Sequence, residues 1–375
     1  MTEIEAGPDG AFDGRLSCPE RASEILSVLR NRTPSRPIRI MNVCGSHERE
    51  VASLGLRRVL PAAFRLIPGP GCPVCVCPES DLRAAVELLS RPGIRMAVFG
   101  DLVRVPLSKP CRGIGSLQEA SAAGGRLHVV ASPLEVSEIA RSHPAEEIVF
   151  FSAGFETTTA PLVALVEGGL PENLSLLLSH KRTSPAVRAL LESGDPGFDA
   201  LIAPGHVTAV TGPEEWAFVP RDHGLPATVC GFYDVSLLAG ILSLKRQVEA
   251  GEARLENLYG RVVRPGGNRR ALEMMDRVFE VGPAVWRGVG TLPESGYRLR
   301  EAHGGADARV RHGLEPPDRE EPMPEGCECH HVFMGRKAPS DCGLFGKACT
   351  PAHPVGPCMV SGEGACRIWI REEGH

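Results

Sequence analysis

The chain has 375 residues and a formal net charge of −5, with 42% hydrophobic and 23% charged residues. This length exceeds what one hydrophobic core usually supports and favours two or three domains, and the composition argues against a disordered or fibrous protein. Because 46 Asp and Glu outnumber 41 Lys and Arg, and no apolar run reaches the ~18 residues of a transmembrane helix, we expect no nucleic-acid partner and no membrane partner.

Residues 1–35 are expected to form a tail and a leading helix, because the apolar residues between 20 and 32 have helical spacing. The first ten residues are acidic and lack the apolar segment of a secretory signal. We therefore expect a cytoplasmic protein in a reducing environment.

Short apolar runs then alternate with helical patterns up to about residue 232, as in a parallel β-sheet covered by helices. The expected strands are 38–45, 94–101, 127–132, 147–154, 174–180, 199–206 and 226–232. The expected helices between them are 81–90, 116–124, 159–169 and 185–193. Since the pattern restarts near residue 147, we expect two α/β domains, at 36–140 and 141–245.

The last part of the chain, 246–375, is expected to form a helical and cysteine-rich domain. A long helical pattern begins near residue 234, and a further helix is expected at 271–280. Beyond residue 282 the chain is rich in Gly, Pro and Arg with little periodicity, so we expect loops there. The predicted fold class is α/β, with two parallel-sheet domains and a cysteine-rich domain.

Polar or reactive residues come at the ends of five apolar runs. They are Cys44, Asp101, Glu156, His180 and His206. Ligands of open parallel sheets bind outside the carboxyl ends of the strands. We therefore expect these side chains to converge on one cleft.

The chain contains 13 cysteines, which in a reducing compartment are metal ligands or redox thiols more often than structural disulfides. Six lie near the end of the chain: Cys327, Cys329, Cys342, Cys349, Cys358 and Cys366. This segment has few apolar residues, so a metal or cluster is expected to replace its missing core. Thiolates suit zinc and iron–sulfur clusters alike, but paired CxxC ligands typical of zinc ribbons are absent from this segment.

Residues 69–78, GPGCPVCVCP, combine glycines that permit close backbone approach with a Cys-x-x-Cys pair. Such a pair can close a disulfide or grip a metal, although Cys75 and Cys77 could equally be small buried apolar residues. Residues 43–48, VCGSHE, place a cysteine and a histidine three residues apart after a strand. They could share one ion or form a thiolate–imidazolium pair, or be an inert thiol and a core histidine.

Taken in order, these motifs resemble the HypD family of hydrogenase maturation factors. The resemblance rests on MNVCGSHE, GPGCPVCVCP, FGDLVRVP, FSAGFETTTAP, PGHV and the tail PSDCGLFGKACTPAHPVGPCMVSGEGAC, and it covers about residues 36–368. It implies two α/β domains plus a cysteine-rich domain that carries a 4Fe-4S cluster.

The resemblance also implies a function. Family members are scaffolds that, with the small partner HypC, hold an iron while two cyanides and one carbon monoxide are attached. HypE delivers the cyanide, and the finished Fe(CN)2CO unit passes to the large subunit of a nickel–iron hydrogenase. Cyanide and carbon monoxide need an electron-rich iron, which thiolate donation supports.

The resemblance implies site residues in the first two motifs, around Cys44 and the CPVC pair. Cys44 would be the iron-binding thiolate, shared with a cysteine of HypC, and His47 would be a further candidate metal ligand. A second histidine often found two positions later is Arg49 here. Cys72 and Cys75 match a redox-active CPVC pair, which we also count among the candidate metal ligands.

The same motifs and the C-terminal tail supply the remaining candidates. Cys77 stands where the family has threonine, and Glu48 matches the motif of Cys44. Polar positions expected to surround the iron are Asp101, Glu156 and His206. The expected cluster ligands are Cys329, Cys342, Cys349 and Cys366, with Cys327 and Cys358 as alternates.

Two other functions remain open from the residues. An iron–sulfur thiol–disulfide oxidoreductase acting on protein partners would need the CPVC pair and a cluster but not Cys44. A zinc-stabilised binding protein would need neither redox centre. The colour of an iron–sulfur cluster after anaerobic purification would exclude the zinc-stabilised protein and is expected for both the scaffold and the oxidoreductase.

Overall fold

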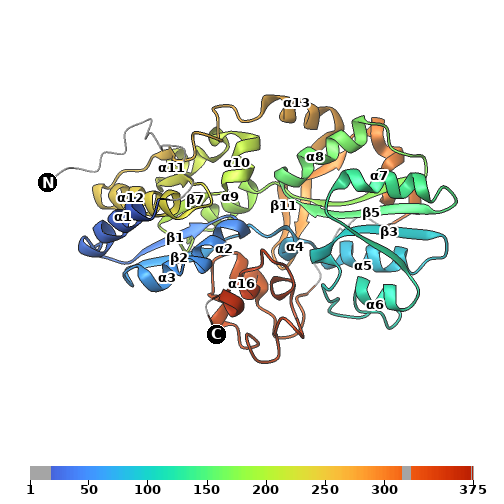
Figure 1. Cartoon of the computed structure of the whole chain (residues 1–375), viewed down its shortest axis with the longest axis horizontal. Helices are drawn as coiled ribbons and strands as arrows, with labels where there is room; N and C mark the ends of the chain where they lie inside the picture. The colour runs from blue at the N-terminus through green and yellow to red at the C-terminus, as the bar shows by residue number, and fades with distance from the viewer. Residues whose placement is uncertain (1–17, 315–321, 373, 375) are drawn as a thin grey trace.

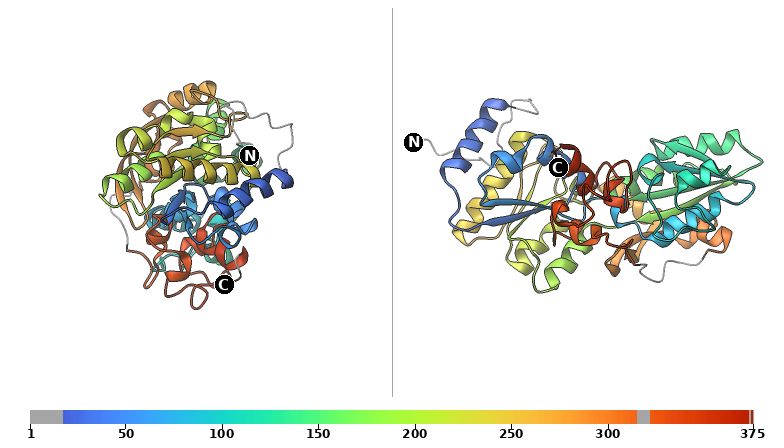
Figure 2. Two further views of the ribbon diagram at one scale, coloured as in Figure 1. Left: turned by 90° about the vertical axis from the view of Figure 1, so that its left-hand side faces the viewer. Right: turned by 90° about the horizontal axis from the view of Figure 1, so that it is seen from below.

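The structure is a computed structural model that describes residues 18–314, 322–372 and 374. The predicted tail before residue 18 lies outside these residues. The described chain forms two parallel sheets in separate lobes, with the cysteine-rich segment against their junction (Figures 1 and 2). No helix among the described residues combines the length and apolar character needed to cross a bilayer.

The first sheet has five parallel strands in the order β2-β1-β7-β8-β9. These strands are β1 (Ile38–Asn42), β2 (Phe64–Pro68), β7 (Ala200–Ala203), β8 (Ala227–Val229) and β9 (Leu255–Asn257). Helices α1 (Pro19–Asn31) and α12 (Asp234–Ala250) pack against each other beside it. Their apolar faces share a core with β1 and β7, where Leu29, Ile40 and Ile241 are fully buried.

The second sheet has four parallel strands in the order β4-β3-β5-β6. They are β3 (Ile94–Phe99), β4 (Arg126–Val130), β5 (Glu147–Gly154) and β6 (Leu174–His180). The surrounding helices are α5 (Glu79–Leu89), α6 (Leu117–Ala122), α7 (Pro133–Ser142) and α8 (Glu156–Glu167). β5 is buried along nearly its whole length, as expected for a central strand covered on both faces.

The α/β class and the parallel pairing are confirmed, but the two sheets do not follow the predicted division at residue 140. The chain leaves the first sheet after β2, builds the whole second sheet, and returns to the first at β7. Residues 36–140 and 141–245 therefore each contribute to both sheets. The alternation of apolar runs marks where strands lie, but it carries no information on which strands pair.

The prediction of loops beyond residue 282 is wrong, because this region contains an antiparallel hairpin. Its strands are β10 (Phe279–Trp286) and β11 (Gly290–Leu299), with a register irregularity between Gly282 and Ala284. Gly and Pro at that irregularity hide the period of two on which a strand prediction depends. The predicted helix at 271–280 is confirmed as α13 (Arg269–Val278).

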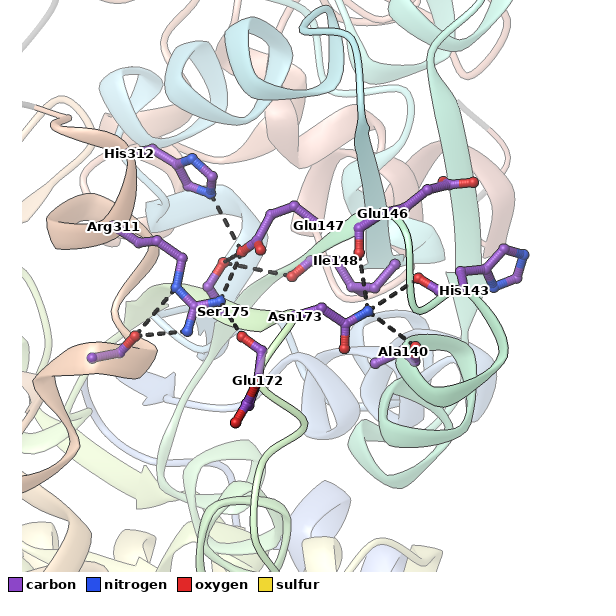
Figure 3. Close-up of polar contacts among 11 residues, drawn as sticks. Ala140, His143, Glu146, Glu147, Ile148, Glu172, Asn173, Ser175, Arg311 and His312 are labelled. Atoms are coloured by element: carbon purple, nitrogen blue, oxygen red, sulfur yellow. Dashed lines mark hydrogen bonds and ion pairs between the residues drawn. The ribbon is translucent and has the colours of Figure 1, made fainter.

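Polar contacts close the second sheet at the end opposite its strand carboxyl termini (Figure 3). The Asn173 amide donates to the carbonyl oxygens of Ala140, in the last turn of α7, and of His143 and Glu146, in the α7–β5 connection. Arg311, on α14 (Ala308–His312), donates to the Glu147 carboxylate at 2.9 Å and to the Glu172 carbonyl at 2.9 Å. These bonds fix the strand starts and leave the other end of the sheet for the site.

The cysteine-rich segment contains two short α-helices, α15 (Cys329–Phe333) and α16 (Ala365–Glu372). α16 packs against α2 (Gly45–Ser53), and α15 packs against α4 (Pro73–Val76). Each contacted helix begins directly after a motif cysteine, Cys44 for α2 and Cys72 for α4. The fold therefore brings the end of the chain onto its early cysteine motifs.

Candidate functional site

Cys44 lies at the carboxyl end of β1 and is the N-cap residue of α2. A cavity of about 10 Å³, room for about one water molecule, borders it. The same cavity is lined by Cys72, Cys75, Cys358 and Glu363. The structure therefore gathers the early thiol, the CPVC pair and one cysteine of the C-terminal segment around one small space.

Cys72 and Cys75 are joined in a disulfide, as the motif allows. Cys72 caps the short helix α4, and its sulfur accepts a hydrogen bond from the Cys75 amide at 3.1 Å. Cys72 and Cys75 are 3% and 0% exposed, so the disulfide is shielded from bulk solvent.

Two glycines let the CPVC loop lie directly on the backbone before α2. The Gly69 amide donates to the Asn42 carbonyl at 2.8 Å, and the Gly45 amide donates to the Gly71 carbonyl at 3.1 Å. A Cβ on Gly71 would lie 2.4 Å from both the Cα and the amide nitrogen of Cys44. No side chain fits in that space, so glycine at this position sets the separation between the disulfide and Cys44.

Burial is the main electrostatic influence on Cys44. It raises the pKa of the thiol to about 11, and nearby Glu363 acts in the same direction, while hydrogen bonds from the His47 and Ser46 amides oppose it. The metal-free thiol is therefore protonated at neutral pH, and a bound metal would release that proton.

His47 is buried but does not line the cavity. Its Nε2 lies 3.1 Å from the Cys230 carbonyl and 3.2 Å from the Gly231 carbonyl, so the neutral ring donates there. Burial lowers the pKa of His47 to about 4. Its Nδ1 has no hydrogen-bond partner within the described chain and is the ring atom left for a ligand. The ring stacks on Phe232, which also stacks with the predicted site residue His206.

Asp101 holds a loop of the C-terminal segment. Its carboxylate accepts hydrogen bonds from the Ser361 hydroxyl at 2.8 Å and the Gly362 amide at 3.0 Å. Arg49, which replaces the expected histidine, donates to the Gly362 carbonyl at 2.9 Å. Both residues thereby position Glu363, which lines the cavity and was not among the residues expected at the site.

Glu156 lies away from this cavity. It begins α8, and its carboxylate accepts bonds from the Thr183 amide at 2.8 Å and the Thr183 hydroxyl at 2.7 Å. Burial raises its pKa. These bonds connect α8 to the segment after β6. The five polar residues expected at strand ends therefore do not all border one cavity.

His180 is likewise a buried structural residue, held between two hydroxyls. The Thr159 hydroxyl donates to the Phe155 carbonyl, so His180 Nδ1 donates to Thr159 at 2.8 Å and Nε2 accepts from Ser152 at 2.8 Å. Burial, with a smaller effect of Lys181, lowers the pKa of His180 to about 3.

This environment predicts acid sensitivity. The unfolded chain binds a proton at His180 below pH ~6.5 and the folded chain does not, so stability present above pH 6.5 is lost as the pH falls toward 3. At pH 5 the loss from this residue is about 2 kcal/mol. Urea unfolding at pH 7.5 and pH 5 should show that His180→Gln depends less on pH than the unsubstituted protein by this amount. An equal dependence in both proteins would contradict the assignment.

Glu48 links the site to the end of the chain. Its carboxylate accepts bonds from Arg57 at 2.8 Å, Asn42 at 2.9 Å and the Trp369 indole at 2.6 Å. The Arg57 guanidinium also lies over the Trp369 ring, 4.6 Å from its centre. The sequence motif marks Glu48, but its partner on α16 lies 321 residues away, which no local pattern reveals.

The C-terminal thiols gather in the same region. Cys358 is fully buried, and the thiols of Cys329 and Cys366 are near enough to raise its pKa. Cys329 likewise raises the pKa of Cys327, and burial, with a smaller effect of Cys329 and Cys327, raises that of Cys349. Cys342, also a predicted cluster ligand, is half-buried and packs against the same core cluster as the other five thiols.

A close backbone approach also marks this group of thiols. A Cβ on Gly356 would lie 2.4 Å from the Cys327 sulfur and 2.6 Å from the Cys329 sulfur. Within the described residues, no three His, Cys, Asp or Glu side chains converge tightly enough to hold a single metal ion. Several thiolates around a glycine are nevertheless the donor set of a larger iron–sulfur cluster, so the residues fit that cofactor.

A larger cavity, of about 290 Å³, lies elsewhere, bordered by Arg182, Arg188, Glu215 and Phe218. Arg182 pairs with Glu215 at 2.9 Å, and Arg188 stacks over Phe218. Arg182, Glu215 and Arg188 are thus already engaged, and none of the predicted site residues lines this cavity.

Comparison with known proteins identifies the family. The family model "HypD: Hydrogenase formation hypA family" matches residues 20–373. The chain is 41% identical to the hydrogenase maturation factor HypD of Azotobacter vinelandii, over 98% of this chain and 96% of that protein. It is 39% identical to the HypD of Rhodobacter capsulatus, over 91% of each chain, and 37% identical to that of Escherichia coli K12, over 96% and 97%. The chain therefore belongs to the HypD family of hydrogenase maturation factors.

Proposed function

We propose that this chain is the scaffold on which the Fe(CN)2CO unit of a nickel–iron hydrogenase is assembled in the cytoplasm. The observation that supports this most strongly is the cavity shared by Cys44, the Cys72–Cys75 disulfide and Cys358. In this cavity the Cys44 thiol is available for an iron ion, and the disulfide beside it can take up two electrons. Cys358 of the C-terminal group lines the same cavity.

In this proposal Cys44 binds the iron that is the cargo, and a cysteine of a HypC-like partner completes the hold on it. Thiolate donation makes the iron electron-rich, which suits cyanide and carbon monoxide. A HypE-like partner delivers the cyanide. His47 contributes through its open Nδ1, and Asp101, with Arg49, holds the loop that carries Glu363. Glu156 and His206 do not line the cavity and contribute through the structure around it.

The C-terminal thiols would hold a 4Fe-4S cluster, with Cys329, Cys342, Cys349 and Cys366 as the proposed ligands. Such a cluster supplies single electrons. The reduction of the Cys72–Cys75 disulfide takes two electrons and two protons and gives two thiols, which can return the electrons to the iron.

The alternative of an oxidoreductase for protein disulfides is less well supported, because both sulfurs of the disulfide are buried. Attack by a thiolate of a partner protein needs access to one of them. Substitution of Cys44 distinguishes the two functions, because only the scaffold requires this thiol.

The test is complementation of a strain that lacks its own HypD. We expect Cys44→Ala to reduce nickel–iron hydrogenase activity to background, and Cys72→Ala to do the same. Cys111→Ala is the matched control, because this free cysteine is half-buried and lies outside the site. Full activity with Cys44→Ala would reject the scaffold proposal, and full activity with Cys72→Ala would reject the role of the disulfide.

A serine scan of the six C-terminal cysteines tests the ligand set. We expect Cys329→Ser and Cys366→Ser to lose iron and the broad visible absorption after anaerobic purification, because a cluster needs four thiolates. Cys327→Ser should retain both. The reverse result for Cys327 and Cys329 would show that the alternate is the ligand.

A further inference from the structure

Asn42 is a buried residue beside the disulfide whose side chain has no part in the site described so far. It is the last residue of β1 and is 2% exposed. Its backbone carbonyl accepts a hydrogen bond from the Gly69 amide at 2.8 Å, which fixes it against the start of the CPVC loop. Asn42 also lines the small cavity that Cys44, Cys72 and Cys75 border. Its place relative to the disulfide is therefore set by both backbone and packing.

The hydrogen bonds of Asn42 determine which way its amide points. Nδ2 lies 2.9 Å from the Glu48 carboxylate and 3.3 Å from the Ile67 carbonyl oxygen. The Glu48 carboxylate accepts from both Arg57 and Trp369, so it faces Asn42 as an acceptor. A flipped amide would turn its oxygen toward two acceptors with no hydrogen between them. Nδ2 therefore faces Glu48 and Ile67, and Oδ1 points away from them.

Oδ1 is buried and has no hydrogen-bond partner in the part of the chain that the structure describes. A buried acceptor without a donor is costly, and native proteins rarely keep one without a reason. The thiols of Cys44 and Cys358 border the same cavity, but neither bonds to Oδ1. The sulfurs of Cys72 and Cys75 carry no hydrogen while they are joined.

Reduction of the disulfide supplies the missing donor. The S–S bond breaks, and two electrons and two protons convert the two sulfurs into two thiols. Each thiol has one hydrogen to donate, and the sulfurs are no longer held at bonding distance. One of them can then turn toward Oδ1 across a space that holds about one water molecule.

We propose that Asn42 is a positioning residue of the CPVC pair, whose Oδ1 accepts a hydrogen bond from a thiol of the reduced pair and so raises its reduction potential. This inference rests on the proposed function only for the redox cycling of the disulfide. Asn42 exchanges no proton and no electron. It lowers the free energy of the dithiol, because the orphaned acceptor gains its donor only in that state.

The test is the redox equilibrium of the purified full-length protein with dithiothreitol and its oxidised form, under anaerobic conditions. The reagent's two thiols close into a disulfide as the protein disulfide opens. Samples started from oxidised and from reduced protein must converge before the Cys72–Cys75 peptide is assayed by alkylation and mass spectrometry. We expect Asn42→Leu, which has no acceptor, to lower the equilibrium constant for reduction about tenfold, or ~30 mV for a two-electron couple.

Asn257→Leu is the matched control, because Asn257 is the last residue of β9 in the same sheet and does not line the cavity. Its Oδ1 accepts from the Tyr259 amide at 3.0 Å, and its Nδ2 donates to the Val263 carbonyl at 3.0 Å. Both variants lose the Nδ2 bond of an asparagine at a strand end. Only Asn42→Leu removes an acceptor beside the disulfide, so Asn257→Leu should leave the potential unchanged.

An infrared difference spectrum of the unsubstituted protein, reduced minus oxidised, gives a second test that needs no variant. We expect two new S–H bands, one of them lowered in frequency because its hydrogen is bonded to oxygen. Two bands at the frequency of a free thiol, or an unchanged potential in folded Asn42→Leu, would overturn this inference and leave the scaffold proposal standing. A pair that stays oxidised in the unsubstituted protein at every dithiothreitol ratio would overturn both this inference and the proposed role of the disulfide.

Discussion

Gly71→Ala is expected to disable the site, with hydrogenase activity in the complemented strain reduced about 100-fold, since catalytic geometry displaced by ~1 Å has effects of this size. The added Cβ would lie 2.4 Å from the Cys44 Cα and amide nitrogen. These are backbone atoms that cannot rotate away, so the CPVC loop or the start of α2 must move. The disulfide and Cys44 then no longer border the same space.

The matched control is Gly260→Ala. Gly260 has no heavy atom within 4 Å of the Cβ position, and neither glycine has a positive φ, so an alanine at either site is compatible with its backbone. We expect normal activity from Gly260→Ala. Normal activity from Gly71→Ala would mean that the separation of the CPVC loop from Cys44 does not matter to the function.

Glu48→Gln is expected to lower the free energy of unfolding by about 3–5 kcal/mol, the usual effect of removing one partner of a buried ion pair. The side chains of Glu48 and Arg57 are 3% and 13% exposed, so the guanidinium would be left without its counter-charge in the interior. The contact between α2 and α16 would weaken with it, because the Trp369 indole donates to the same carboxylate.

Chemical denaturation measures this effect. Glu252→Gln is the control, because Glu252 and its partner Arg254 both have side chains more than half exposed, and such pairs contribute at most about 1 kcal/mol. A double-mutant cycle of Glu48→Gln with Trp369→Phe isolates the indole contact. A loss no larger for Glu48→Gln than for Glu252→Gln would show that the network does not join the two ends of the chain.

The candidate reactive residues can be selected from the sequence because the patterns that mark them are local. Cys44 follows a short apolar run, and the CPVC pair follows two glycines, so both positions can be found from neighbouring residues alone. The helix at 269–278 and most strands are found for the same reason, since their apolar periods lie within the element.

What the sequence did not predict depends on contacts between distant residues. β1 pairs with β7 across more than 150 residues, and this pairing moves the second sheet into the middle of the chain. Glu363 reaches the cavity only because Asp101 and Arg49 hold its loop. The β10–β11 hairpin lies in a stretch without a periodic signal, because Gly and Pro interrupt the strand pattern.

The infrared spectrum of the protein purified anaerobically with its HypC-like partner tests the central claim most directly. Metal-bound cyanide and carbon monoxide absorb where proteins do not, so an assembled iron unit would be seen on the scaffold itself. We predict both kinds of band for the unsubstituted chain and neither for Cys44→Ala. Bands that persist in Cys44→Ala, or a spectrum without them in the unsubstituted complex, would contradict the account.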